Sequence, residues 1–566
     1  MENKQGLNKL QWKLMDYFRG YDFRSYEKAL ATSYLVLQLK ERKIYDVIDK
    51  SMRELCSVID DPDIYNFIYE MMSGVEQSFL LSLLDHEASD LRSFVLDDEF
   101  GVFVRSEEQA TPQSIIELAL NILKIQPNEK VLDNCSGLGS FLTTAYNDYQ
   151  SGAMYYGVEI NPTATAIAKM RASLISGNFN FVVGNAFDQH FNDQLFDKAF
   201  SNYPFGIRLK ISDVGYELFN KLQQSMPELV RATSSDWAFN YTLCERLSAE
   251  GTAVAVTSLG GLWNTIDKPI RELFIKQRRI KAIIKLPAKL FAFTAIPVAL
   301  IIFGEGDETV RMIDASKQYK EGRRQNILAA DNITNILHAL DYDTEYSKTV
   351  SFEEIAVNQF NLDPTRYIEV VEEVENGVNF ETIITRITRG APSSAKDLDE
   401  MTSLIPTDFQ YVTLANIRNG IIDQDLPYLK EIPVRFDKYC IKKGNILLSK
   451  NGYPFKVAVV EDTKEKSIVA NGNLYIIELD TSKVNPYYIK AFLESDKGIA
   501  QLKRISVGST IPNIGVAQLN TIKIPMIPME KQESIANRYL AILDEIELMR
   551  RRIEKCENTL KTIISD

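Results

Sequence analysis

Residues 131–141 read VLDNCSGLGSF, and this stretch decides the fold. A short apolar strand runs into Asp133, a turn follows with Gly137 and Gly139, and a helix begins near Phe141. Glycines allow positive φ angles and let the backbone pass close to a ligand. Open α/β sheets bind ligands at the carboxyl ends of their strands, where this turn lies. The pattern indicates a ligand-binding turn or, alternatively, a tight strand-to-helix turn that holds no ligand.

The surrounding sequence alternates apolar strands with helices from about residue 110 to 305. This alternation is typical of a parallel, doubly wound sheet. The first 100 residues instead have apolar side chains at three- and four-residue spacing, which predicts helices. We therefore expect an α/β, Rossmann-like domain behind a helical front. Its strands are expected at KVLD, YYGVEI, FNFVVG, FDKAFSN, GTAVAVTSL, IKAIIKLP and VALIIFG.

The second and third strands end in side chains suited to a nucleoside. Glu159 closes YYGVEI, where an acid can accept hydrogen bonds from ribose hydroxyls, although it can also cap the following helix. Asn185 and Phe187 follow the third strand and can contact an adenine ring. The G-x-G-x-x-G of dinucleotide folds is absent, because position 142 is Leu. Of the two cofactor classes, nicotinamide and S-adenosylmethionine, the pattern favours S-adenosylmethionine.

The fourth strand runs into SNYPFG, residues 201–206. An amino group on a nucleobase is a poor nucleophile, and two acceptors aimed at its hydrogens make its lone pair available. The Asn202 side-chain oxygen and the Tyr203 carbonyl can be those acceptors. Pro204 stiffens the turn, and Phe205 offers a flat face to a base that has left its helix. Taken alone, these residues also suit an ordinary turn.

Several blocks in order resemble the N6-adenine DNA methyltransferases, specifically the modification subunit of type I restriction–modification systems. The order of cofactor turn, N-Y-P-F and recognition part resembles that of the γ class. The family usually has proline at position 203, but any residue supplies a main-chain carbonyl. The resemblance covers about residues 1–370 and rests on a Thr111–Pro112 pair, DNCSGLGSF, NYPF, SSDWAFNYTL (234–243), KAIIKLPAKLFAFTAIPVALIIF (281–303) and NQFNLDPTRYIE (358–369).

The resemblance implies a cofactor, a reaction and roles for the matching positions. The cofactor is S-adenosylmethionine, no metal is implied, and the methyl group goes to a flipped adenine. The target adenine is expected at Asn202, Tyr203, Pro204 and Phe205, and the cofactor at Thr111, Asp133, Gly137, Gly139, Phe141, Glu159, Asn185 and Phe187.

The C-terminal third resembles half of a type I specificity subunit, which recognises a DNA target. The matching segments are YVTLANIRNG, KKGNILLSKNG and STIPNIGVAQLNTIKIPMIPMEKQESIANRYLAILDEI. We therefore expect a helical domain at 1–105, a methyltransferase domain at 106–370, a linker at 371–400, a recognition domain at 401–528 and a coiled-coil helix at 529–566.

The last of these segments has apolar residues alternately four and three positions apart. Such spacing suits a helix packed on its own domain or a coiled-coil seam, and four regular heptads favour the seam. The residues are Ile535, Tyr539, Ile542, Ile546, Met549, Ile553, Cys556, Leu560 and Ile563. We expect double-stranded DNA as a partner, together with a second copy of the chain or a specificity subunit. No nuclease or G-x-x-x-x-G-K pattern is present, so cleavage requires a restriction or translocase partner.

Composition narrows the remaining possibilities. The net charge is −13, yet residues 401–566 carry 23 Lys and Arg against 20 Asp and Glu, which favours this part as the DNA-facing one. Five cysteines without a CxxC pair, three scattered histidines and the lack of a long apolar run indicate a cytoplasmic protein without a metal site or membrane span. The resemblance to restriction–modification subunits implies a bacterial, nucleoid-associated location. Two alternatives remain: a catalytically silent DNA-binding or assembly subunit, and a methyltransferase acting on RNA or protein glutamine.

Overall fold

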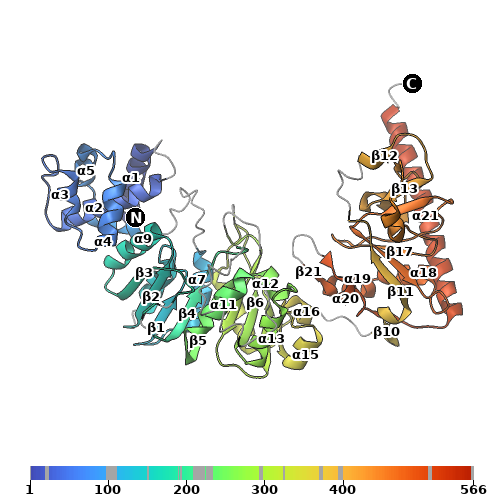
Figure 1. Ribbon diagram of the computed structural model, residues 1–566. Helices are drawn as coiled ribbons and strands as arrows, with labels where there is room; N and C mark the ends of the chain where they lie inside the picture. The colour runs from blue at the N-terminus through green and yellow to red at the C-terminus, as the bar shows by residue number, and fades with distance from the viewer. Residues whose placement is uncertain are drawn as a thin grey trace. The chain divides into compact units, whose positions relative to one another are not determined.

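The chain divides into two compact units, Met1–Ile368 and Glu369–Asp566 (Figure 1). The computed structural model describes residues 2–19, 24–96, 111–149, 152–188, 190–191, 194–207, 224, 234–291, 297–322, 325–368, 374–392, 400–507 and 513–562. Within these ranges, no helix combines the length and the apolar character needed to cross a membrane.

The N-terminal part of the first unit consists of helices joined by turns in its described ranges. Its centre is α2 (Ser25–Glu41), most of whose residues are buried. The hydrophobic cluster that contains the buried residues of α2 also contains Ile167 and Met170 of α9 (Pro162–Ser173). The helical part is therefore continuous with the α/β part that follows it. In Figure 1, α9 lies between these helices and β3 (Asn178–Val183). The other helices are α1 (Glu2–Phe18), α3 (Met52–Cys56), α4 (Pro62–Met71), α5 (Gln77–Leu83) and α6 (Ala88–Leu96).

A nine-stranded sheet in the order β3-β2-β1-β4-β5-β7-β6-β8-β9 forms the rest of this unit. The expected strands are all present. Those outside β3 are β1 (Lys130–Asp133), β2 (Met154–Glu159), β4 (Phe196–Ser201), β5 (Leu247–Ser258), β6 (Ile280–Lys285), β7 (Val298–Phe303), β8 (Thr309–Asp314) and β9 (Ser347–Ser351). Because β1, β2, β3 and β4 are parallel neighbours, their carboxyl ends meet at one edge.

Hydrophobic clusters cover both faces of the sheet. Along β5, Ala253 and Ala255 belong to one cluster, and Val254 and Val256 belong to the other, as the two-residue period of a strand requires. The first cluster includes α11 (Ser235–Glu245) and α13 (Lys268–Lys276), and the second includes α7 (Gln113–Leu123), α8 (Ser140–Tyr149) and α14 (Ala330–Asp341). The short helices are α12 (Leu259–Trp263), α15 (Phe352–Val357) and α16 (Thr365–Ile368). This is the expected doubly wound, Rossmann-like arrangement.

The direction of β7 differs from the all-parallel expectation. β7 runs antiparallel to both β5 and β6, between which it lies. The connection from β6 to β7 spans residues 286–297, and its described residues contain no crossover helix. A parallel neighbour needs a crossover connection of a dozen or more residues, usually a helix, whereas a direct return produces an antiparallel pair. Apolar runs alone do not report strand direction.

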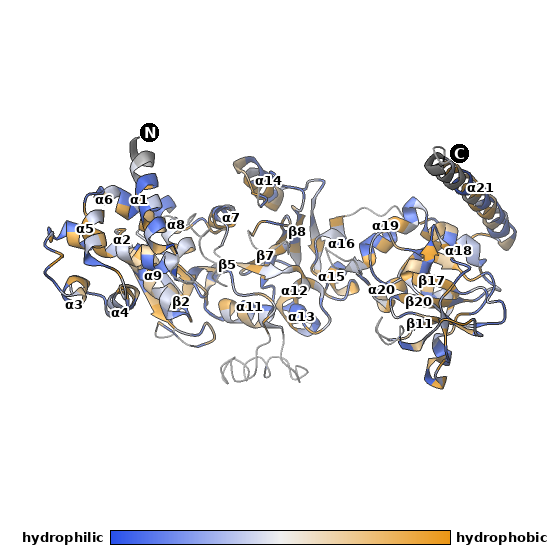
Figure 2. Ribbon diagram, turned by 90° about the horizontal axis from the view of Figure 1, so that it is seen from above, coloured by the Kyte–Doolittle hydropathy of each residue, from blue (hydrophilic) through white to orange (hydrophobic). Residues whose placement is uncertain are grey.

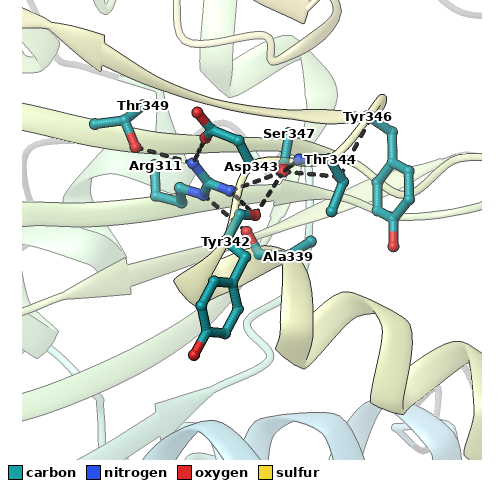
Figure 3. Close-up of polar contacts among 8 residues, drawn as sticks. All are labelled: Arg311, Ala339, Tyr342, Asp343, Thr344, Tyr346, Ser347 and Thr349. Carbon is teal, nitrogen blue, oxygen red and sulfur yellow. Dashed lines mark hydrogen bonds and ion pairs between the residues drawn. The ribbon is translucent and has the colours of Figure 1, made fainter.

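Arg311 fastens the far edge of the sheet to the end of α14 (Figure 3). Its Nε donates to the carbonyl of Ala339 at 2.7 Å, and its terminal nitrogens donate to Thr349 Oγ1 and Ser347 Oγ at 2.9 and 2.8 Å. The same guanidinium pairs with Asp343 and bonds the carbonyl of Tyr342. A cation here satisfies carbonyls that the helix C-terminus leaves without intrahelical partners.

The second unit is built mainly from short strands and two four-stranded sheets, β11-β20-β17-β18 and β12-β16-β13-β19. Its strands are β10 (Gly377–Asn379), β11 (Ile384–Arg389), β12 (Thr402–Ser403), β13 (Phe409–Val412), β14 (Ile417–Arg418), β15 (Ile421–Ile422), β16 (Tyr428–Leu429), β17 (Ile446–Ser449), β18 (Val457–Val459), β19 (Ser467–Ala470), β20 (Leu474–Leu479), β21 (Ser506–Val507), β22 (Asn513–Ile514) and β23 (Lys523–Pro525). Its helices are α18 (Pro486–Leu493), α19 (Asp496–Ile505), α20 (Val516–Leu519) and α21 (Met529–Thr562).

Part of the expected linker at 371–400 belongs to this second unit. β11 pairs antiparallel with β20, and β10 pairs with β23. Between them, Phe380 and Ile383 are buried in the cluster that also holds one face of β17 and β20. The acidic and polar composition of this segment predicts a linker and gives no sign of its few buried apolar residues. These residues pack against strands that lie about 100 residues later in the chain.

Candidate cofactor and target-base site

The glycine turn after β1 has the conformation that its sequence predicts. Gly137 and Gly139 both have positive φ, +50° and +80°. A Cβ on Gly139 would lie 3.0 Å from the Ala168 Cβ, so this position lets the turn approach α9 closely. A Cβ on Gly137 would meet nothing within 4 Å. The turn is therefore packed on one side and open at Gly137.

Glu159 at the end of β2 holds this turn through its carboxylate. Its Oε2 accepts the Gly137 N–H at 2.9 Å, and its Oε1 accepts the Asn161 N–H at 2.8 Å. A carboxylate has about four lone-pair sites, so both oxygens keep capacity for a further donor. The N–H groups of Gly137 and Asn161 thus hold the Glu159 carboxylate in one orientation, and two neighbouring hydroxyls of a ligand can also donate to it.

Asp133 lies beneath the turn, where it is 2% exposed. Its Oδ1 accepts the Cys135 N–H at 3.2 Å. Burial raises the pKa of the Asp133 carboxyl to about 8, the charge of Glu159 adds to this effect, and the Cys135 bond opposes it. Neither side-chain atom of the neighbouring Asn134, which is 3% exposed, has a hydrogen-bond partner in the described part of the chain. The turn thus offers a buried amide with unused capacity.

Phe141 has a different place from the one expected. It is 2% exposed, and its ring stacks on Phe200 with a centroid distance of 4.2 Å and an angle of 15°. It belongs to a core cluster under the sheet rather than to the open side of the turn. As the second residue of α8, Phe141 packs this helix on the strands.

The third strand end brings Asn185 and Phe187 together. The Phe187 N–H donates to Asn185 Oδ1 at 3.1 Å, and the Asn185 carbonyl lies 2.9 Å from His190 Nε2. The Phe187 ring is 8% exposed and packs against Phe239 of α11, with centroids 4.6 Å apart and a 34° angle. Most of this ring therefore faces inward.

Asn202 and Thr111 are brought together from positions 91 residues apart. Asn202 Nδ2 donates to Thr111 Oγ1 at 2.9 Å, and both side chains are half-buried. Thr111 was expected at the cofactor, and its observed hydrogen-bond partner is Asn202, which was expected at the target base. With the nitrogen engaged, the side-chain oxygen of Asn202 is the atom left for a ligand's N–H.

Tyr203 and Phe205 lie in the same loop but differ in the exposure of their side chains. The Tyr203 side chain is 1% exposed and stacks on Phe239, with centroids 5.0 Å apart and a 5° angle. Phe205 is half-buried and meets Tyr203 and Phe291 edge-on at 6.0 and 6.3 Å. Phe205 thus keeps part of its ring at the surface, while Tyr203 does not.

Asp236 of α11 supports the loop, and no role was predicted for it. Its buried carboxylate accepts the Ser258 Oγ–H at 2.5 Å and the Ser258 N–H at 3.3 Å, and the Gly206 N–H also points to it. Burial raises the pKa of Asp236 despite these bonds. The segment SSDWAFNYTL carried the resemblance, but neither its acid nor its second aromatic residue, Phe239, has a spacing that reveals a function.

The strand neighbours place these pieces side by side. β1 and β4 pair with Asp133 opposite Phe200, so the glycine turn and the Asn202 loop leave adjacent strand ends. β2 and β3 continue the same edge with Glu159 opposite Val183. No group of three or more His, Cys, Asp or Glu side chains in the described ranges could hold a metal ion.

Both parts of the chain match known families. Residues 105–376 match the family described as N-6 DNA Methylase, and residues 399–558 match the one described as Type I restriction modification DNA specificity domain. The chain is 24% identical over 390 residues to the "Type I restriction enzyme MpnII methylase subunit" of Mycoplasma pneumoniae, covering 62% of this chain and 68% of that protein. It is 27% identical over 337 residues to the "Type I restriction enzyme MjaVII methylase subunit" of Methanocaldococcus jannaschii, covering 55% and 58%.

Among solved structures, the type I restriction-modification methyltransferase subunit of Streptococcus thermophilus has a similar fold. The TM-score is 0.50 at 20% identity, and the match covers 64% of this chain and 99% of that one. The fold is thus the Rossmann-like one of S-adenosylmethionine-dependent methyltransferases, and S-adenosylmethionine is the cofactor. The chain joins a domain of the N-6 DNA methylase family to a type I restriction modification DNA specificity domain.

Proposed function

We propose that this chain transfers a methyl group from S-adenosylmethionine to N6 of an adenine flipped out of double-stranded DNA, at sites chosen by its own C-terminal domain. The observation that carries the proposal is the bond from Asn202 Nδ2 to Thr111 Oγ1. It turns the amide so that its oxygen is available at the strand edge where the glycine turn also lies. An acceptor there suits an exocyclic amino group.

For the cofactor, the proposal uses the open side of the turn. Glu159 accepts the ribose hydroxyls, while Asn185 and Phe187 lie at the cofactor's adenine. Gly137 and Gly139 give the backbone its course, and Asp133 supports the turn from below. The unpaired amide of Asn134 and the open space at Gly137 fit such a ligand. Thr111 bonds Asn202 and Phe141 stacks on Phe200, so the proposal gives neither of them a cofactor contact.

In this reaction the residues of the chain orient the target base relative to the methyl group. S-adenosylmethionine supplies a methyl group on a positively charged sulfur, and when the sulfur–carbon bond breaks its electrons stay on sulfur as a neutral thioether. Asn202 Oδ1 and the Tyr203 carbonyl accept the two hydrogens of N6, which draws its lone pair out of conjugation and toward the methyl carbon. Pro204 limits the turn's freedom, and the exposed part of the Phe205 ring stacks on the flipped base. The nitrogen gains the methyl group and releases one proton.

The long helix α21 supports a proposal about partners. Its first turns pack on its own unit, because Gln532 and Ala536 are buried and Tyr539 bonds Lys490 of α18 at 2.6 Å. From Asp544 to the end of the helix, every side chain whose exposure is described is exposed. Hydrophobic residues are interspersed with hydrophilic ones along it (Figure 2). The exposed apolar residues of the expected seam are Ile535 (42%), Ile542 (47%), Ile546 (38%), Met549 (51%) and Ile553 (57%).

A helix that projects with an apolar stripe needs a second helix to cover it. Two copies joined through this stripe would present two recognition domains, and together they would read a bipartite site. Pairing with a separate specificity subunit is the alternative, and a restriction or translocase partner would be needed for cleavage. Light scattering of the purified chain with DNA tests the homodimer, since particles that hold only one 64.4 kDa chain would contradict it.

Single-molecule sequencing of genomic DNA from cells with and without the gene tests the enzymatic proposal. An N6-methyladenine motif that appears only with the gene, and disappears with Asn202→Ala, would support it. A chain that binds DNA and S-adenosylmethionine but leaves no methyl mark would instead be a silent DNA-binding subunit. Transfer to RNA or protein alone would contradict the substrate.

A further inference from the structure

The catalytic loop and the cofactor subsite are joined by aromatic rings. Tyr203 stacks parallel on Phe239, and Phe239 also packs against Phe187. All three rings are at most 8% exposed. Phe239 is therefore shared between the target-base loop after β4 and the segment after β3.

The helix that supplies Phe239 also holds the far end of the loop. Asp236 lies three residues before Phe239, so both side chains are on neighbouring positions of one helix face. Asp236 takes the Gly206 N–H and the Ser258 hydroxyl. A displacement of α11 would therefore move both ends of the loop that carries Asn202 and Phe205.

The position of the Tyr203 ring matters because its main-chain carbonyl is one of the two proposed acceptors. Proline, which is usual here in the similar family, restrains φ through its own ring. Tyr203 lacks this ring constraint on φ, but its side chain is restrained by packing. Its neighbours are Phe239, Phe205 and the polar side chains of Asn240 and Thr257. Interiors pack like crystals, so a buried ring keeps its backbone in one arrangement.

We propose that Tyr203 is a positioning residue whose ring, through Phe239 and Phe187, ties the geometry of the catalytic loop to the subsite for the cofactor's adenine. This inference rests on the proposed function. It assigns Phe239 a part in the site that the glycine turn and the N-Y-P-F motif do not reveal. Tyr203 then influences cofactor affinity although it does not touch the cofactor.

The test measures S-adenosylmethionine affinity by calorimetry on the full chain. Tyr203→Phe keeps the stacked ring, while Tyr203→Met keeps most of the volume and removes the stacking. Aromatic pairs contribute about 0.5–1.5 kcal/mol beyond their burial, so Tyr203→Met should raise the Kd about threefold to tenfold. Because Tyr203→Phe keeps the stacked ring, its Kd should remain within about twofold of the parent value, which is no more than the smallest effect of losing the stacking.

Phe274→Leu is the matched control. Phe274 is fully buried in the same cluster, but its ring partners are Trp237, Tyr241 and Phe303. It should lower the melting temperature like Tyr203→Met and leave the Kd within about twofold, because its ring contacts in the described ranges do not include Tyr203, Phe239 or Phe187. Phe239→Leu supplies a second probe if Tyr203→Met does not fold, and it should raise the Kd in the same way.

Double variants decide whether the rings act together. Tyr203→Met with Phe239→Leu should weaken binding less than the product of the single effects, whereas Tyr203→Met with Phe274→Leu should match the product. Equal Kd values for Tyr203→Met and Tyr203→Phe, or a multiplicative effect with Phe239→Leu, would overturn the inference. A parent chain that binds S-adenosylmethionine but transfers no tritiated methyl to unmethylated genomic DNA would contradict the proposed function alone, because the affinities would still decide the role of the rings.

Discussion

Asn202 Nδ2 lies 2.9 Å from Thr111 Oγ1, although the two residues are 91 positions apart in the sequence. Thr111 opens the segment that leads into α7, and Asn202 follows β4. The contact gives the asparagine amide one orientation, with its oxygen left for an amino group. The following predictions begin with this pair.

Asn202→Ala should abolish methyl transfer and leave DNA binding intact, because its side chain is half-buried and the proposed recognition of the DNA site lies in the C-terminal unit. Loss of one such transition-state contact lowers kcat by about 100-fold or more. Tritiated-methyl incorporation into genomic DNA measures the first effect, and an electrophoretic shift measures the second. Asn121→Ala on the exposed face of α7 is the control, and its activity should match the parent.

Thr111→Val should lower kcat while leaving S-adenosylmethionine affinity unchanged, because the hydroxyl orients Asn202 rather than the cofactor. One lost hydrogen bond is worth about 1 kcal/mol, which is about fivefold in rate. Thr111→Ser retains the hydroxyl and should retain the rate. A weaker affinity with an unchanged kcat would return Thr111 to the cofactor role that the sequence suggested.

Asp133→Asn should stabilise the chain at neutral pH and flatten the pH dependence of its unfolding. The folded pKa of Asp133 is about 8, above its ordinary value of 3.8, so the folded state binds a proton that the unfolded state releases. Stability relative to the Asn variant therefore falls as pH rises between these values, by at most about 1.4 kcal/mol per pH unit, and levels off above the folded pKa.

Denaturant unfolding of both proteins from pH 5 to 9 measures this difference. The Asn side chain keeps the Oδ1 that accepts the Cys135 N–H, so its turn should be preserved. A difference that grows as pH falls, or none at any pH, would contradict the raised pKa.

Ile546→Glu should convert a paired chain to a 64.4 kDa monomer with little change in its melting temperature, because Ile546 is exposed within its own unit. A charge in an apolar seam is desolvated on pairing and opposes it. Light scattering measures the mass, and Arg552→Glu, at an exposed position outside the seam, is the control. A monomeric parent chain would contradict the pairing itself.

The sheet shows how far periodicity reaches. Each run between residues 130 and 303 that was expected as a strand forms one, because a buried strand must be apolar over most of its length. The reversal of β7 was not predictable, since it follows from the path of a connection and not from the composition of the strand. In the same way, β11 was hidden in a polar segment because its partner β20 lies far along the chain.

Within the site, the outcome differs between backbone and side chains. The positive φ of Gly137 and Gly139 and the place of Glu159 at the end of β2 follow from the sequence, because they depend on local conformation, while their contact with a cofactor stays a prediction. Phe141 and Tyr203 show the limit of this reasoning. Their motif positions suggested a cofactor contact for Phe141 and, for Tyr203, only a main-chain carbonyl that accepts a hydrogen bond. Burial at 2% and 1% instead places both rings in the core.

The amino-acid sequence by itself determined which strand each motif follows, the glycine turn, the loop that carries Asn202 and the apolar stripe of the last helix. These features depend on local conformation and regular spacing. Only the tertiary structure decided that Thr111 bonds Asn202, that Asp236 supports Gly206, and that Phe239 joins Tyr203 to Phe187. Such contacts join residues that are distant along the chain. They arise from how helices pack on the sheet, and no local pattern encodes them.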